Sequence, residues 1–158
     1  DGKEFKPCLA QKAPKSLKSA IIEPILDFIE RKGFKVAIIS GARNEAVRER
    51  FKELGVFDIY LGAHHKLEAY QDLMDNYNLN PEEILYIGDD VPDIPVMKKV
   101  GLGCCPSDAV TDVKAVSDYI SHKKGGDGCV RELIEQVLRV QGKWSLDIGA
   151  RDIGVDKD

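Results

Sequence analysis

Short apolar segments alternate along this chain with single segments of helical periodicity, and this alternation restricts the fold more than any other feature. The apolar segments cover residues 34–40, 57–61, 83–87, 101–105 and 118–120. Their almost continuous apolar character is typical of strands that are buried on both faces of a parallel sheet. Strands separated by single helices imply right-handed crossovers. The chain is therefore predicted to form a Rossmann-like, doubly wound α/β sheet.

Helical periodicity and helix-end residues predict the segments that connect these strands. The predicted helices cover residues 24–33, 44–55, 66–77, 92–99 and 127–141. Pro24 is suited to a first helical turn, and Asn44 can cap the next helix. We predict one core over residues 24–144, an irregular segment before it (1–23), and a tail (145–158) that is mobile or ordered by a partner.

Composition limits the classes of function. The chain has 158 residues, a net charge of −4 and a pI near 5.5, which argues against binding to nucleic acid or to an anionic membrane. No apolar run approaches the roughly 20 residues that span a bilayer, and the first residues lack the pattern of a signal peptide. We therefore expect a cytoplasmic protein. The four cysteines lack a zinc-binding spacing and are expected to be reduced thiols that pack as small apolar residues.

Polar residues follow three of the predicted strands. Ser40-Gly41-Ala42-Arg43 follows the first, Gly62 to Lys66 follows the second, and Gly88-Asp89-Asp90-Val91-Pro92-Asp93 follows the third. Because the carboxyl ends of parallel strands meet at one edge of the sheet, these groups are expected to converge. Hydroxyl, lysine and carboxylate groups suit an anionic substrate and a hard cation such as Mg²⁺.

Each of these segments also has an ordinary structural interpretation. Ser40-Gly41 could be a strand-to-helix turn, and Lys66 could be a solvated residue at a helix start. The acidic segment 88–93 is harder to explain in this way, because three carboxylates within five positions repel one another unless a cation or a base compensates. His64 and His65 have no matching set of metal ligands nearby and are expected on the surface.

The acidic segment carries a family resemblance. Residues 86–97 (Tyr-Ile-Gly-Asp-Asp-Val-Pro-Asp-Ile-Pro-Val-Met) resemble the metal-binding motif of the 3-deoxy-D-manno-octulosonate 8-phosphate phosphatases, within the haloacid dehalogenase superfamily. The resemblance extends upstream to residues 37–43, 58–62 and 66–70, and downstream to 100–102, 106–109, 113–120, 125–132 and 141–144. It covers the chain from about residue 24 to residue 144.

The resemblance implies a haloacid dehalogenase-like core without a large cap domain. It also implies Mg²⁺-dependent hydrolysis of a sugar-acid phosphate monoester through an aspartyl-phosphate intermediate, with 3-deoxy-D-manno-octulosonate 8-phosphate as the expected substrate. Such an enzyme serves lipopolysaccharide biosynthesis. Family members form homotetramers in which a neighbouring subunit helps to close the active site.

Roles carried over by matching position define a candidate site. The resemblance implies that Asp89 is a metal ligand and that Asp90 and Asp93 support the metal site. The other implied roles are phosphoryl binding by Ser40 and Gly41, charge neutralisation by Lys66, and a place near the substrate entrance for Arg43, Gly125 and Gly126.

The chain departs from the family at its beginning. The first strand of the family ends in Asp-x-Asp-Gly, and no such motif follows an apolar strand before residue 34. Asp1-Gly2 either ends that motif, in which case Asp1 is the general acid and base, or forms the turn of an early hairpin. The attacking aspartate is missing in both alignments. Asp127 also stands where members often have a basic residue.

These departures leave three interpretations open. The sequence could be part of a longer, normal phosphatase, which is the interpretation that we favour. It could instead be a catalytically inactive relative that acts as an oligomerisation or interaction module. A flavodoxin-like receiver or small-ligand binding domain would share the strand–helix alternation, but would need neither the acidic segment nor the glycine-rich turn.

Overall fold

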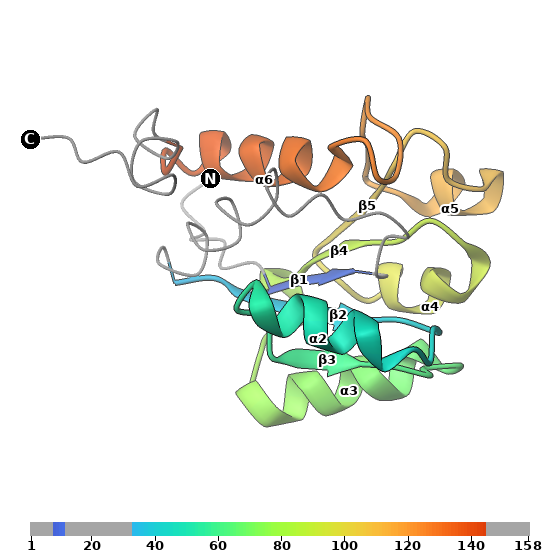
Figure 1. Cartoon of the computed structure of the whole chain (residues 1–158). Coiled ribbons are helices and arrows are strands. Elements are labelled where there is room, and N and C mark those ends of the chain that lie inside the picture. The colour runs from blue at the N-terminus through green and yellow to red at the C-terminus, as the bar shows by residue number, and fades with distance from the viewer. Residues whose placement is uncertain (1–7, 12–32, 145–158) are drawn as a thin grey trace, which may run out of the picture.

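The computed structural model describes residues 8–11 and 33–144 (Figure 1). Its centre is a six-stranded sheet with the order β3-β2-β1-β4-β5-β6, in which every neighbouring pair is parallel. The strands are β1 (Cys8–Gln11), β2 (Lys35–Ile39), β3 (Asp58–Tyr60), β4 (Leu85–Ile87), β5 (Leu102–Cys105) and β6 (Tyr119–Ile120). The predicted doubly wound α/β fold is confirmed.

Helices connect the strands, and the start of α2 is marked in the sequence. They are α2 (Glu45–Glu53), α3 (Lys66–Tyr77), α4 (Ile94–Met97), α5 (Thr111–Val116) and α6 (Cys129–Val140), with short 3₁₀ helices η1 (Pro81–Glu83) and η2 (Val91–Asp93). Asn44 caps α2 as predicted, because its side chain accepts a hydrogen bond from the Ala46 amide. None of the helices in the described part of the chain is long and apolar enough to cross a membrane.

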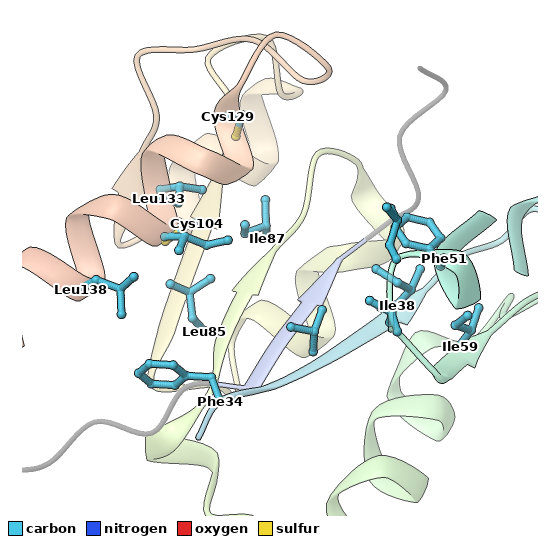
Figure 2. Close-up of a cluster of buried hydrophobic side chains, with 14 residues drawn as sticks. Phe34, Ile38, Phe51, Ile59, Leu85, Ile87, Cys104, Cys129, Leu133 and Leu138 are labelled. Carbon is cyan, nitrogen blue, oxygen red and sulfur yellow. The ribbon is translucent and has the colours of Figure 1, made fainter. Parts of the chain in front are cut away.

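Two hydrophobic clusters cover the two faces of the sheet. Residues that alternate along β2, β4 and β5 point to opposite faces. Figure 2 shows the cluster in which α6 and Phe51 of α2 pack on the face that carries Ile38, Leu85, Ile87 and Cys104. The other cluster packs α3, α4 and α5 against the face that carries Ala37, Ile39, Tyr86 and Cys105. Helices on both faces explain why the strands are apolar throughout.

The cysteines in this core behave as predicted. Cys104, Cys105 and Cys129 are free and buried. Burial raises the pKa of the Cys129 thiol to about 11, so that the neutral thiol is the stable form at neutral pH. These residues therefore contribute apolar packing.

The main correction concerns the segment 1–23, which was predicted to be irregular. It contributes β1, the strand that lies between β2 and β4. The sequence Cys-Leu-Ala-Gln has no β-branched residue, and its strand conformation comes from pairing on both edges. Helix α5 was also not predicted. The predicted helix 24–33 and the predicted tail 145–158 lie outside the described residues.

Candidate active site

Backbone hydrogen bonds join the loops that follow β2 and β3. The Ser40 amide donates to the Tyr60 carbonyl (2.8 Å), and the Ser40 carbonyl accepts from the Ala63 amide (3.0 Å). A third bond runs from the Gly62 amide to the Ala42 carbonyl (2.9 Å). Ser40 is only 1% exposed, and its Oγ accepts a hydrogen bond from the Ala42 amide. This side of the carboxyl edge is therefore a fixed loop pair that begins with the predicted phosphoryl-binding residue.

The carboxylate of Asp93 links this loop pair to the loop that follows β4. Its Oδ1 accepts from Lys66 Nζ at 2.5 Å and from the Tyr86 hydroxyl at 2.6 Å. Its Oδ2 accepts from the backbone amides of Asp89 (3.0 Å) and Asp90 (3.2 Å). Asp93 and Lys66 are 0% and 4% exposed. One buried carboxylate thus fixes both the predicted phosphate-neutralising lysine and the backbone beside the predicted metal ligand.

Electrostatics favour the ionised form of Asp93. Burial opposes ionisation, but the Lys66 ammonium and the hydrogen bonds outweigh it and hold the pKa of the Asp93 carboxyl below its ordinary value. Burial and the same carboxylate raise the pKa of Tyr86 far above its ordinary value, so its hydroxyl keeps its proton and donates it. Lys66 and Asp93 consequently form a buried ion pair.

Gly88 is required by the close approach of Asp93 to the chain. A Cβ at Gly88 would lie 2.4 Å from Asp93 Cβ, a distance that no side chain tolerates. Asp90 closes the same turn, because its Oδ1 accepts from the Val91 amide at 2.8 Å. The Gly-Asp-Asp-x-x-Asp spacing therefore has a packing reason as well as a chemical one.

The contacts of Asp93 fit the supporting role that the resemblance implies for it, and they do not fit a role as a direct metal ligand. The two oxygens of Asp93 already accept four hydrogen bonds, which fills their acceptor sites. Asp93 therefore has no acceptor site left for a direct bond to a cation, and Asp90 is half-buried and caps η2. Within the described residues no group of three or more His, Cys, Asp or Glu side chains is arranged to hold a metal ion.

The exposed Asp89 is the carboxylate that fits a cation at this edge. Mg²⁺ usually takes one or two carboxylates and keeps several waters, so Asp89 with substrate oxygens meets its minimum requirement. The central strand adds no carboxylate: β1 ends at Gln11, and the sequence from Phe5 to Ile22 contains neither Asp nor Glu. Asp1, the predicted general acid and base, lies outside the described residues.

The remaining predicted residues lie on loops at the same edge. Arg43 Nη2 lies 2.6 Å from His64 Nε2. The Gly125 amide donates to Asp108 Oδ1 at 2.9 Å, and this bond ties the glycine-rich turn to the loop after β5. Gly126 takes a left-handed conformation with a φ of 83°, which a residue with a Cβ rarely adopts.

Sequence reasoning missed Tyr86 and His64. Tyr86 is inside an apolar strand, and in sequence it is indistinguishable from a core aromatic residue. His64 was assigned to the surface, where it is indeed exposed, but its contact with Arg43 depends on two separate loops.

Tyr86 provides a stability prediction with an internal control. We expect Tyr86→Phe to lower the free energy of unfolding by about 1.5–3 kcal/mol, the usual range for a hydrogen bond to a charged group. Tyr70 is a second buried tyrosine, and its hydroxyl has no hydrogen-bond partner in the described structure. Tyr70→Phe should therefore be neutral or stabilising. Urea unfolding measures both, and equal losses would contradict the assigned role of the Tyr86 hydroxyl.

The parallel sheet, with a hydroxyl after β2, a lysine at the start of α3 and an acidic turn after β4, agrees with the resemblance to the haloacid dehalogenase-like hydrolases. The sequence profile of that family matches residues 11–101. The chain belongs to this family.

The chain is also similar in sequence to curated phosphatases of one substrate class. The chain is 41% identical over 109 residues to the 3-deoxy-D-manno-octulosonate 8-phosphate phosphatase of Salmonella typhi, and 40% identical over 109 residues to that of Escherichia coli K12. Each match covers 69% of this chain and 58% of the relative. The chain thus matches a little over half the length of these curated relatives.

Solved structures agree with this placement. The cobalt-bound deoxy-D-mannose-octulosonate 8-phosphate phosphatase of Haemophilus influenzae is 25% identical, with a TM-score of 0.84 over 94% of this chain and 96% of that chain. The 3-deoxy-D-manno-octulosonate 8-phosphate phosphatase of Moraxella catarrhalis, in complex with magnesium, phosphate and KDO, is 27% identical. Its TM-score is 0.79, over 96% of this chain and 95% of that chain.

Proposed function

We propose that this chain is the phosphoryl- and metal-binding part of a Mg²⁺-dependent phosphatase that hydrolyses 3-deoxy-D-manno-octulosonate 8-phosphate. The observation that carries the proposal is the Asp93 carboxylate, which joins Lys66 to the backbone of Asp89 on the edge where Ser40 follows β2. A buried lysine–carboxylate pair is costly to maintain in a fold that makes no use of it. The proposed substrate is taken from the phosphatases to which the chain is similar.

Ser40 and the loop amides would hold the oxygens of the phosphoryl group. Lys66 would add positive charge close to them, and preorganised donors of this kind stabilise the charge that spreads over the oxygens in the transition state. Asp89 would hold the magnesium ion. When bound, that ion supplies charge neutralisation at the phosphate.

The attacking group is expected to be an aspartate, which would form an aspartyl-phosphate intermediate. No candidate for it lies among the described residues, and Asp1 would fit the second role, general acid and base, only if Asp1-Gly2 ends the nucleophile motif.

The assembly and location of the protein follow from the same resemblance. A core without a large cap leaves the carboxyl edge open, and a neighbouring subunit of a homotetramer would close it. A role in lipopolysaccharide biosynthesis and a cytoplasmic location would accompany the proposed substrate.

One observation favours the alternative of a catalytically inactive interaction module. The strand that lies between β2 and β4 ends at Gln11, without a carboxylate. The curated relatives give this alternative no support, because they are named as phosphatases.

Metal removal and readdition test the proposal. The full-length protein is incubated with 3-deoxy-D-manno-octulosonate 8-phosphate, and phosphate release is measured with Mg²⁺, with EDTA, and with EDTA followed by excess Mg²⁺. We expect release with Mg²⁺, its loss with EDTA, and its recovery. Absence of release under all three conditions, from a protein whose circular dichroism shows that it is folded, would favour the inactive module.

A further inference from the structure

The side chains of Arg43 and His64 form a polar contact between the loops that follow β2 and β3. Arg43 Nη2 and His64 Nε2 are 2.6 Å apart, and both residues are exposed. A guanidinium can only donate, so Nε2 of His64 must be the acceptor. The imidazole in this contact is therefore neutral, with its proton on Nδ1.

This contact leaves the charge of Arg43 uncompensated. No ion pair joins Arg43 to a carboxylate in the described part of the chain, whereas Lys66 is paired with Asp93 at 2.5 Å. A neutral imidazole orients the guanidinium without cancelling its charge. Of these two cations, Arg43 is the exposed one, and it has no carboxylate partner among the described residues.

The backbone positions this pair beside the phosphoryl-binding groups. Arg43 follows Ser40 by three residues and His64 precedes Lys66 by two, on loops that are joined by the Gly62–Ala42 and Ala63–Ser40 hydrogen bonds. The stem of Arg43 lies over Gly62, where an added Cβ would be 3.6 Å from Arg43 Cγ. Arg43 and His64 therefore lie on the same two joined loops that carry Ser40 and lead to Lys66.

We propose that Arg43 binds the carboxylate of a phosphate ester whose leaving group is a sugar acid, and that His64 is a positioning residue that aims the guanidinium. A planar guanidinium suits a carboxylate because it can donate two parallel hydrogen bonds. A guanidinium has five N–H donors, so that Arg43 can bind a carboxylate with two of them and still donate to His64. This inference rests on the proposed phosphatase function and adds the basis of its substrate selectivity.

Two esters separate carboxylate recognition from catalysis. The variants His64→Ala, His64→Gln and Arg43→Ala are assayed in the full-length protein with 3-deoxy-D-manno-octulosonate 8-phosphate and with p-nitrophenyl phosphate, which has no carboxylate. His65→Ala is the matched control, because His65 is the neighbouring exposed histidine and makes no side-chain capping bond to α3. Circular dichroism confirms that each variant is folded.

The expected result is selective. His64→Ala should raise the KM for the sugar-acid ester about 3- to 10-fold more than the KM for p-nitrophenyl phosphate, which corresponds to one hydrogen bond. Arg43→Ala should have a larger selective effect, and His64→Gln, which keeps an acceptor, should recover part of the loss. The kcat for the sugar-acid ester should change little, and His65→Ala should leave both esters unaffected.

Equal changes for the two esters, or none, would overturn the inference while leaving the phosphatase proposal intact. Should neither ester be hydrolysed, the phosphatase proposal fails. Calorimetric titration with 3-deoxy-D-manno-octulosonate in the presence of phosphate then tests the subsite directly. Binding that weakens in His64→Ala but not in His65→Ala supports the subsite, and absence of binding to the wild-type protein refutes it.

Discussion

Replacement of Asp89 by asparagine is expected to lower Mg²⁺-dependent turnover of the sugar-acid phosphate by at least about 10²–10³-fold, the usual effect of removing one positioned electrostatic group. The neutral amide keeps the shape of the side chain but loses the charge that attracts the cation. The backbone amide of Asp89 still donates to Asp93, so the fold should be preserved. The measurement is the dependence of kcat/KM on magnesium concentration.

The control for this variant is Asp112→Asn, which alters another acidic residue, in the first turn of α5. It should leave turnover and magnesium dependence unchanged. Full activity of Asp89→Asn at the same magnesium concentration would remove Asp89 from the metal site, even if the enzyme proved to be a phosphatase.

Replacement of Asp93 by alanine is expected to produce the largest loss of stability, about 3–5 kcal/mol, because it leaves the Lys66 ammonium buried without a partner. Two backbone amides and the Tyr86 hydroxyl also lose their acceptor. Urea or thermal unfolding measures the loss. A change below about 1 kcal/mol, the range for exposed ion pairs, would contradict the buried geometry.

The double variant Lys66→Met/Asp93→Ala separates the charge from the hydrogen bonds. Removal of the ammonium eliminates the unpaired charge, so the double variant should be more stable than Asp93→Ala alone. It should not reach the wild-type stability, because the amides of Asp89 and Asp90 still lack an acceptor. If the stability losses of Lys66→Met and Asp93→Ala simply add up in the double variant, Lys66 and Asp93 are not coupled.

The same pair predicts a pH dependence. The pKa of Asp93 is lower in the folded state than in the unfolded chain, so the ion pair stabilises the fold at pH values above about 4, the ordinary value for Asp. This stabilisation is lost as the pH falls through the lower, folded-state pKa. The difference in stability between the wild type and Asp93→Ala should therefore shrink in acid, and a constant difference would contradict the assignment.

Two levels of this protein could be predicted from its sequence. The first is the parallel sheet, because strands with helices on both faces must be apolar throughout, as Ile38-Ile39 and Leu85-Tyr86-Ile87 are. The second is the list of residues at the carboxyl edge, because the direction of parallel strands sends Ser40 and Asp89 to the same side. Both follow from local pattern and strand direction.

Only the tertiary structure decided what those residues do to one another. β1 is a strand because it is paired on both edges, which four residues without β-branching do not reveal. Asp93 became a buried support because Lys66 and Tyr86, from different elements, reach the same oxygen. Similarly, His64 became a partner of Arg43 because two loops are joined by backbone hydrogen bonds. Hydrogen bonds and ion pairs act over a few ångströms in space, and the distance between residues along the chain carries little information about them.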